Sequence, residues 1–220
     1  MSDGLDGARR GPKPGEAKQM VVFLHGYGAD RSDLLGLADT LMPHMPDTVF
    51  VAPNAPEKSR ANPFAFQWMP VPWMDGSSLQ AAAASMQSSL VRLNVYLDQV
   101  LDEEGLAAAR MILFGFSQGT MMALHVAPRR AQQVAGIVGF SGLLLEPDRL
   151  AHEVVSKPPV LLLHGDRDEM VPPESLPAAM GVLRSAGFEV FSHIMKGTAH
   201  GIAPDGLNVA LAFMRDRFGL

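Results

Sequence analysis

Short apolar runs alternate along the chain with longer segments of helical periodicity, and this alternation restricts the possible folds more than any other feature of the sequence. Several of the runs are continuous stretches of Val, Leu, Ile and Phe, which are typical of parallel strands covered on both faces. Strand and helix in alternation predict an α/β domain with a mostly parallel central sheet and helices on both faces. The predicted strands occupy residues 20–24, 48–52, 110–116, 134–140, 160–164 and 189–194.

The segments between these runs have the spacing of helices that pack against a sheet. In the longest of them, apolar residues from Leu79 to Val100 recur at steps of three and four, which places them on one stripe facing the sheet. No repeat and no linker divides the chain, so we expect a single domain over residues 19–220. Residues 1–18 are polar and lack the apolar core of a signal peptide, and we expect a flexible N-terminal segment there. The predicted helices occupy residues 33–42, 78–103, 119–127, 175–186 and 203–218.

The composition excludes several classes of function. The 220 residues include no cysteine, which rules out disulfides, thiolate metal sites and a cysteine nucleophile. The net charge of −5 is mild, and no basic stripe of the kind that binds nucleic acid is present. No uncharged apolar run reaches the roughly 18–20 residues that cross a bilayer. We expect a cytoplasmic protein with no nucleic-acid partner and no stable membrane insertion.

The stretch LFGFSQG, residues 113–119, places a serine between two glycines where a predicted strand ends and a predicted helix begins. Such a serine sits on a sharp turn with its hydroxyl above the sheet, and glycines at 115 and 119 remove β-carbons that would collide with neighbouring backbone. The N-terminal amides of the next helix suit a developing negative charge. The pattern predicts Ser117 as a nucleophile, and the alternative is a serine that only caps the helix.

A serine nucleophile needs a base, and the base needs an orienting acid, in the chain order serine, acid, histidine. We expect His200 to be the base, because the small-residue loop GTAHGI places it where an imidazole can reach a serine on another strand. The other histidines fit structural positions better. His125 precedes every candidate acid, His164 ends a buried strand, and His193 alternates within a strand.

Two aspartates in the turn HGDRDEMVPP are candidates for the acid. Asp166 and Asp168 both follow the predicted strand at 160–164, and spacing alone does not choose between them. One would orient the imidazole while the other bonds turn amides. Glu146 is a third candidate, which we expect to be a surface carboxylate. The histidines lack the spacing of metal ligands and HExxH is absent, so we expect neither a metal nor another cofactor.

Acyl transfer also requires two backbone amides that bind the developing oxyanion. One would come from Gln118, directly after the nucleophile. The other would come from the loop LHGYGAD, where two glycines allow a tight bend that turns the amide of Tyr27 inward. The letters GYGADR look like part of a dinucleotide fingerprint, but Arg31 stands at the third glycine position and excludes that interpretation.

Residues 53–77 interrupt the rhythm of strand and helix with five prolines, both tryptophans and two phenylalanines. A loop of this length in a compact domain is usually functional. We expect an acyl group to lie against Trp68, Trp73 and Met170, with Phe66 as a further neighbour; the alternative is that these residues pack over the sheet. Apolar walls without a basic residue favour neutral acyl esters of short or medium length. Any homodimer would form through an apolar patch near this loop.

Six motifs, in this order between Gln19 and the C-terminus, resemble the phospholipase/carboxylesterase family of α/β-hydrolases, which includes acyl-protein thioesterases and small bacterial carboxylesterases. The motifs are FLHGYGAD, APNAP, FQW, GFSQG, LLLHGDRDEMVP and GTAHGI. The resemblance implies an α/β-hydrolase fold without a large cap domain. It also implies Ser117 as nucleophile, His200 as base, Asp168 as the acid, and the amides of Tyr27 and Gln118 as the oxyanion hole.

Two departures from the family pattern concern the substrate. Family members usually carry a branched aliphatic residue where this chain has Tyr27, which would make the mouth of the site narrower or more polar. The loop around FQWMPVPWMDG is longer than in the thioesterases, which argues against long-chain protein substrates.

The predicted activity is that of a cofactor-free serine carboxylesterase, which hydrolyses small-molecule esters through an acyl-enzyme intermediate. A thioesterase or a lysophospholipase would use the same residues with a different leaving group. Outside enzymes, the alternative is a non-catalytic hydrolase-fold protein that binds a ligand or partner. Such proteins usually have a broken triad, whereas every required residue is present here.

Overall fold

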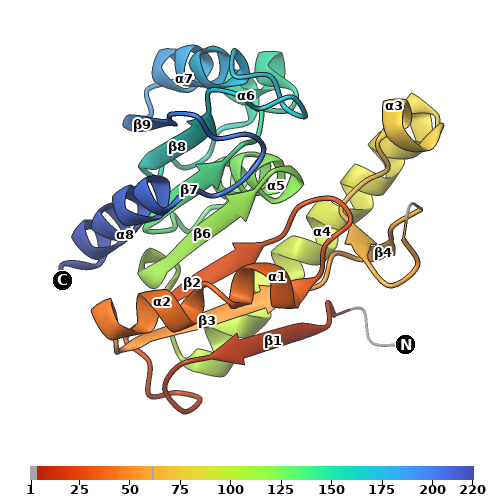
Figure 1. The fold of residues 1–220 in the computed structure, drawn as a ribbon. Coiled ribbons are helices and arrows are strands. Elements are labelled where there is room, and N and C mark those ends of the chain that lie inside the picture. Colours follow the sequence, from red (N-terminus) through yellow and green to blue (C-terminus); the bar gives the residue numbers. More distant parts are fainter. Residues whose placement is uncertain (1–3, 61) are drawn as a thin grey trace.

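The computed structural model describes residues 4–60 and 62–220, and it shows a seven-stranded sheet between two layers of helices (Figure 1). The strand order is β1-β3-β2-β6-β7-β8-β9, in which β1 is antiparallel to β3 and every other pair is parallel. The α/β-hydrolase architecture expected from the sequence is confirmed. The strands are β1 (Gly7–Arg10), β2 (Gln19–Leu24), β3 (Thr48–Pro53), β6 (Met111–Phe116), β7 (Gly136–Phe140), β8 (Val160–Gly165) and β9 (Val190–Met195).

All of the predicted strands are present, with ends that differ from the prediction by one or two residues. Every residue of β2, β3, β7 and β8 is buried, as expected for strands covered on both faces. The helices are α1 (Arg31–Leu35), α2 (Ala38–Leu41), α3 (Pro72–Asp75), α4 (Leu79–Glu104), α5 (Gln118–Val126), α6 (Pro147–Glu153), α7 (Ser175–Ser185) and α8 (Pro204–Phe218), together with three short 3-10 turns.

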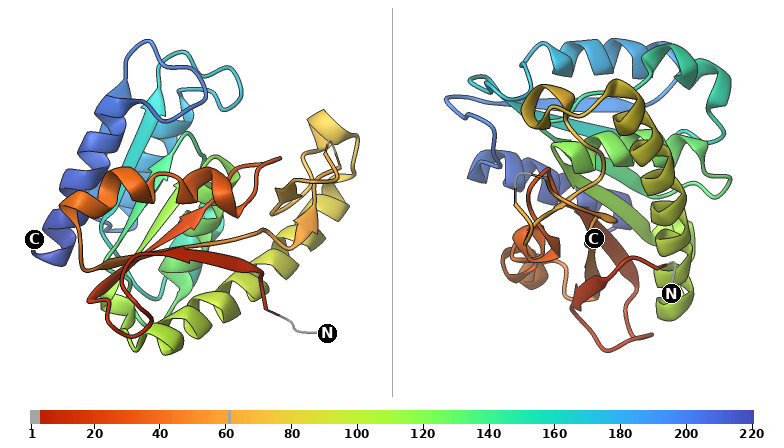
Figure 2. Two further views of the ribbon diagram at one scale, coloured as in Figure 1. Left: turned by 60° about the horizontal axis from the view of Figure 1, so that its bottom comes forward. Right: turned by 90° about the vertical axis from the view of Figure 1, so that its right-hand side faces the viewer.

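Helices cover both faces of the sheet (Figure 2). Each face has its own apolar core. Helices α4, α5 and α7 pack on one face, and α1, α2 and α8 pack on the other. Successive strand side chains point to opposite faces, so Val22 belongs to the first core and Phe23 to the second. The Phe23 ring contacts those of Phe50 and Phe114, with centroid separations of 5.7 and 5.1 Å.

The N-terminal end of α4 extends beyond the sheet together with α3 and the hairpin of β4 (Glu57–Lys58) and β5 (Phe66–Gln67) (Figure 1). Ser78 begins α4, since its hydroxyl accepts a hydrogen bond from the amide of Ala81. Leu79, which the helical spacing placed on the buried stripe, is 80% exposed because the sheet ends before this turn. Ala83, the next residue of the predicted stripe, is exposed as well, so the prediction is wrong for the first two residues of the stripe and the buried positions begin at Met86.

The structure also corrects the prediction for the N-terminal segment. Residues 7–10 form the edge strand β1, paired with β3 from Gly7 opposite Pro53 to Arg10 opposite Phe50. The Arg9 side chain donates to Glu104 at the end of α4 at 2.9 Å. Backbone pairing and ion pairs hold this strand in place. Its sequence is polar and therefore lacks the apolar pattern from which a strand is predicted. Residues 1–3 of the predicted flexible segment lie outside the described residues.

Three further differences come from short elements. The helix predicted over residues 33–42 is divided into α1 and α2 around Gly36, and α6 was not predicted. Within residues 53–77, α3 is closed by the Asp75 carboxylate, which accepts hydrogen bonds from the amides of Val71 and Ser77. Elements of two to seven residues are too short for a periodic pattern.

No helix in the described part of the chain is both long enough and apolar enough to cross a membrane.

Candidate active site

Ser117 occupies the sharp turn between β6 and α5. Its backbone has φ 55° and ψ −116°, a conformation that costs free energy for any residue with a β-carbon. The Ser117 amide donates to the carbonyl of Phe140 in the adjacent strand at 2.9 Å, which fixes the turn to the sheet. The turn therefore lifts the hydroxyl above the carboxyl ends of the parallel strands, where α/β sheets place their sites.

The two flanking glycines are required by the close approach of backbone. A β-carbon at 115 would lie 2.4 Å from the amide nitrogen of Thr120, and one at 119 would lie 1.8 Å from the carbonyl oxygen of Leu24. Neither contact is possible without a shift of main chain. The steric explanation that the sequence gives for Gly115 and Gly119 is confirmed.

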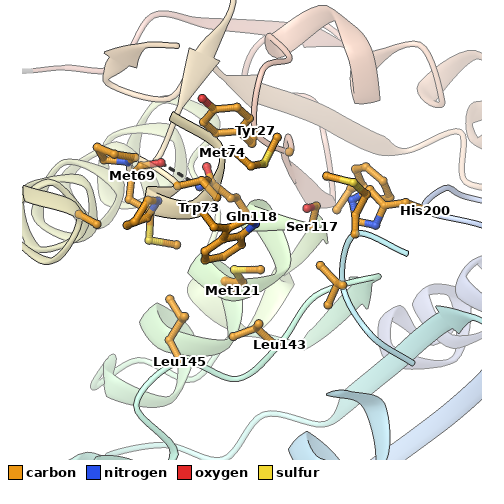
Figure 3. Close-up of a pocket in the computed structure, with 18 of the residues that line it drawn as sticks. Tyr27, Met69, Trp73, Met74, Ser117, Gln118, Met121, Leu143, Leu145 and His200 are labelled. Atoms are coloured by element: carbon orange, nitrogen blue, oxygen red, sulfur yellow. Dashed lines mark hydrogen bonds between the residues drawn. The ribbon is translucent and has the colours of Figure 1, made fainter. Parts of the chain in front are cut away.

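His200 and Asp168 come together across two loops at the same edge of the sheet. The Nδ1–H of His200 donates to Oδ2 of Asp168 at 2.8 Å; a carboxylate only accepts, so this contact places the proton on Nδ1. Nε2 is left with its lone pair in the neutral ring. His200 also packs against Phe116, with a ring-centroid separation of 4.8 Å. Figure 3 shows Ser117 and His200 at the same cavity.

The Asp168 carboxylate is fully buried and has hydrogen bonds on both oxygens. Oδ1 accepts from the amides of Met170 and Val171, both at 2.9 Å, and His164 Nε2 lies 3.4 Å from Oδ2. Burial alone would raise the pKa of Asp168, but the hydrogen bonds from Val171, His200 and Met170 outweigh it, and the pKa lies below its ordinary value. Asp168 is therefore an anion positioned to stabilise a charged imidazole.

The other candidate groups occupy different places. Asp166 is exposed and accepts the amide of Gly197 at 2.6 Å, which is the turn-bonding role foreseen for one of the two aspartates. Glu146 forms a surface ion pair with Arg149 at 3.2 Å. His193 pairs with Asp205 at 2.7 Å on the far edge strand. None of these groups lines the cavity at Ser117.

The amides of Tyr27 and Gln118 lie on segments that flank Ser117, and both residues line the cavity. Tyr27 belongs to the loop after β2, while Gln118 is the first residue of α5, where the amide has no partner within the helix. In residues 4–60 and 62–220, neither amide donates a hydrogen bond to another protein group. Both donors are thus available to an oxygen atom bound beside Ser117.

A buried network of polar groups joins these two segments. The His25 ring has Nδ1 at 2.8 Å from the Gly26 carbonyl and accepts the Ala55 amide at Nε2 at 3.0 Å. Burial is the main reason that the pKa of His25 is lowered, so the ring is neutral. The Gln118 side chain accepts the Trp68 amide at 3.1 Å. It also donates to the carbonyl of Met69 at 2.9 Å, which is the bond drawn in Figure 3.

A cavity of about 450 Å³ opens beside Ser117 and is lined almost entirely by apolar side chains (Figure 3). Among the described residues that line the cavity, Asp33 is the one with a carboxylate, and none is a lysine or an arginine. Helix α3, the first turns of α4 and α5 and the loops after β7 and β8 all contribute to its wall. The lining residues are Gly26, Tyr27, Ala29, Asp33, Met69, Pro70, Val71, Pro72, Trp73, Met74, Leu79, Ala82, Phe116, Ser117, Gln118, Met121, Leu143, Leu145, Met170, Val171 and His200.

Of the four residues that the sequence predicted to contact an acyl group, two line the cavity and two do not. Trp73 and Met170 line the cavity, and both are exposed. Trp68 is fully buried and does not line the cavity, and its indole Nε1 donates to the carbonyl of His25 at 3.0 Å. Phe66 lies outside the cavity, where Lys58 Nζ is 3.7 Å from its ring centroid. The prediction of an acyl contact is corrected for Trp68 and Phe66.

Several lining residues were not predicted from the sequence. Leu79 and Met121 fall on helices, where apolar spacing looked the same as that of core residues. Leu143 and Leu145 follow β7 in a short loop that carries no recognisable motif. For Met74, which lies near the mouth of the cavity, the neighbouring prolines in the sequence indicated irregular structure. Within the described residues, no group of three or more His, Asp or Glu side chains is arranged to hold a metal ion.

Comparisons with known proteins show which family the chain is similar to. A family model described as Phospholipase/Carboxylesterase matches residues 11–217. The chain is 29% identical to acyl-protein thioesterase 1 of Saccharomyces cerevisiae, over 96% of this chain and 98% of the yeast protein. It is also 25% identical to esterase YpfH of Escherichia coli, over 90% of this chain and 83% of that protein.

Among solved structures, the crystal structure of esterase PE8 is similar, with a TM-score of 0.91 and 41% sequence identity. The similarity covers 97% of this chain and 99% of the PE8 chain. An acyl-protein thioesterase 2 from Zea mays shares the fold, with a TM-score of 0.77, 22% identity and coverage of 97% of this chain and 99% of that chain. Relatives and fold thus point to one family of hydrolases.

Proposed function

This chain belongs to the phospholipase/carboxylesterase family of α/β-hydrolases, and on that premise we propose that it hydrolyses neutral carboxylic esters with short to medium acyl chains. The observation that carries this proposal is the union of three features at one cavity. Ser117 stands on a strained turn, His200 is paired with buried Asp168, and the wall beside them is apolar.

Acylation begins when Ser117 Oγ attacks the ester carbonyl carbon while Nε2 of His200 takes the hydroxyl proton. The carbonyl oxygen becomes an oxyanion, which the amides of Tyr27 and Gln118 bind. His200 then returns the proton to the departing alkoxide, and the alcohol leaves as the C–O bond breaks. The Asp168 carboxylate stabilises the imidazolium that forms between these two transfers.

Deacylation repeats the sequence with water as the nucleophile. His200 removes a proton from water, the resulting hydroxide attacks the acyl carbon, and the same amides bind the second oxyanion. The proton passes from His200 to Ser117 Oγ as the acyl bond breaks, which releases the carboxylic acid and restores the enzyme. All of these steps use groups of this chain alone.

The cavity supports a substrate that is neutral and apolar on its acyl side. Burying a methylene group is favourable by about 0.8 kcal/mol. The apolar side chains of the wall, among them Met69 and Leu145, offer such contacts to an acyl chain. An anionic substrate would find no lysine or arginine in the lining and would face Asp33. The name of the yeast relative favours thioesters as a second candidate class, and the same groups would cleave them with a thiolate as leaving group.

The direct test is hydrolysis of p-nitrophenyl esters from acetate to dodecanoate by the unmodified protein and by Ser117→Ala. We expect kcat to fall by several orders of magnitude in the variant for every ester, because the nucleophile is lost. The matched control is Ser156→Ala, which removes a serine hydroxyl of equal burial that bonds the carbonyl of Ala127 and does not line the cavity.

Two further results are informative. Matched oxygen and sulfur esters with the same acyl group separate a carboxylesterase from a thioesterase through their kcat/KM values. Equal hydrolysis by Ser117→Ala and the unmodified protein would contradict the proposal, and GFSQG would then be a turn without a nucleophile.

A further inference from the structure

Trp68 connects the two segments that carry the amides proposed for the oxyanion hole. Its indole Nε1 donates to the carbonyl of His25 in the loop after β2, at 3.0 Å. Its backbone amide donates to the side-chain oxygen of Gln118 at the start of α5, at 3.1 Å. Both bonds are buried, and the Trp68 residue is fully buried. One residue thus bonds both segments at once.

In the loop after β2, hydrogen bonds of His25 fix the peptide unit that contains the Tyr27 amide. Nδ1 of His25 lies 2.8 Å from the Gly26 carbonyl oxygen, which only accepts, so the ring donates from Nδ1. Its Nε2 then accepts the Ala55 amide at 3.0 Å, in agreement with that tautomer. The Gly26 carbonyl and the Tyr27 N–H belong to one planar peptide unit and point in opposite directions. Fixing the carbonyl therefore fixes the direction of the N–H.

On the side of α5, the Gln118 side chain is held at both ends. Its oxygen accepts the Trp68 amide, and its nitrogen donates to the Met69 carbonyl at 2.9 Å. The Trp68 carbonyl is itself held, because Ser89 Oγ of α4 donates to it at 2.5 Å. Gln118, whose backbone amide is proposed to bind the oxyanion, is thus anchored through its own side chain to the same segment that anchors the Tyr27 loop.

The two donors lie beyond the last pair of the β2–β6 ladder, Leu24 opposite Gly115, so the sheet sets the register of the strands but not the directions of these two amides. The loop around Tyr27 is flanked by Gly26 and by Gly28, which has φ 73°. An oxyanion is stabilised only when both donors lie about 2.7–3.1 Å from it. A misplacement of about 1 Å can cost roughly 100-fold in rate.

We propose that Trp68 is a positioning residue that holds the Tyr27 and Gln118 amides at the spacing an oxyanion requires. This inference rests on the proposed function. It also gives the buried tryptophan a place in the reaction that differs from the substrate contact expected from the sequence, since Trp68 does not line the cavity.

The test replaces Trp68 with 3-(3-benzothienyl)alanine, which keeps the shape of indole and substitutes sulfur for the N–H group. Trp68→Phe is the genetically simple companion. For an ester of optimal chain length, we expect kcat to fall about 10-fold to 100-fold. Affinity for a trifluoromethyl ketone, which forms an oxyanion on Ser117, should fall by a similar factor. The chain-length optimum and the inhibition constant of the matching alkyl alcohol should stay unchanged, because the cavity wall is intact.

The controls separate this role from loss of stability and from failure of the proposed function. Phe50→Leu removes a buried aromatic ring from the opposite core and should lower Tm without lowering kcat. Unchanged kcat and ketone affinity in the benzothienyl protein would overturn the inference, as would a shifted chain-length optimum. Ser117→Ala is assayed beside it. Retained activity there overturns the proposed function itself, whereas an inactive Ser117→Ala with a fully active benzothienyl protein overturns the role of Trp68 alone.

Discussion

His125 is buried in the last turn of α5, eight residues after Ser117, and its pKa is lowered to about 4. Burial is the main cause and the positive charge of Arg129 adds to it, while the carboxylates of Glu146 and Glu153 act in the opposite direction. In the unfolded chain the pKa of a histidine is about 6.5. Between these two values the unfolded state binds a proton that the folded state does not bind, so lowering the pH favours unfolding.

We therefore expect the free energy of unfolding to decrease as the pH falls from about 6.5 to 4, with a contribution from His125 of up to about 3 kcal/mol. His125→Leu should remove that contribution, because the unfolded chain then has no proton to gain at this position. Urea denaturation at a series of pH values measures it. An acid dependence of the same size in the variant and the unmodified protein would show that the buried imidazole does not cause it.

At the scale of elements, helix α3 and the first turn of α4 form the outer wall of the cavity. Trp73 and Leu79 line the cavity while they are 77% and 80% exposed. We expect Trp73→Ala and Leu79→Ala each to raise KM for octanoate esters by about 5-fold to 30-fold, because about 1–2 kcal/mol of apolar contact with the acyl chain is lost. Acetate esters are too short to reach this wall, so their KM should change little.

Phe64→Ala is the matched control for those two variants. Phe64 is 84% exposed on the loop between β4 and β5, and it does not line the cavity. Its removal should leave the chain-length profile unchanged. If all three variants raise KM for octanoate esters equally, the acyl chain is not bound where the cavity places it.

At the scale of the whole molecule, Glu104 at the C-terminal end of α4, the longest helix, connects that helix to the edge strand β1. Its carboxylate is buried, accepts from Arg9 at 2.9 Å and accepts the Gly15 amide at 3.1 Å. Glu104→Ala should lower the free energy of unfolding by about 1–3 kcal/mol, because the hydrogen bonds from the Arg9 side chain and the Gly15 amide to a buried carboxylate are lost. Chemical denaturation measures the loss.

The exposed pair of Arg10 and Asp39, at 3.0 Å, is the comparison for Glu104. Asp39→Ala should change stability by at most about 1 kcal/mol, since both charges are solvated. Folded Glu104→Ala protein should keep its kcat, because this contact lies outside the cavity at Ser117. A loss of kcat without a loss of stability would contradict this separation of edge strand and site.

Local chemistry explains why the strands, the long helices and the turn at Ser117 could be predicted from the sequence. The strands and long helices repeat their apolar residues over enough positions to show a period, and every predicted strand is found within two residues. The turn at Ser117 is equally local, since Gly115 and Gly119 are required by contacts that any strand-turn-helix of this shape makes. The sequence therefore predicted the α/β sheet, and it singled out the residues that the structure gathers at its carboxyl edge.

Spacing along the chain does not determine which of several similar residues come together in space, although the family resemblance implies Asp168 rather than Asp166. Asp166 and Asp168 share one turn and one chemistry, and only the packing of two loops brings Asp168 to His200 while Asp166 bonds Gly197. Trp68 and Trp73 lie in one proline-rich segment, yet one is buried between loops and the other lines the cavity. These outcomes depend on contacts between segments distant along the chain, and such contacts leave no period or spacing in the sequence.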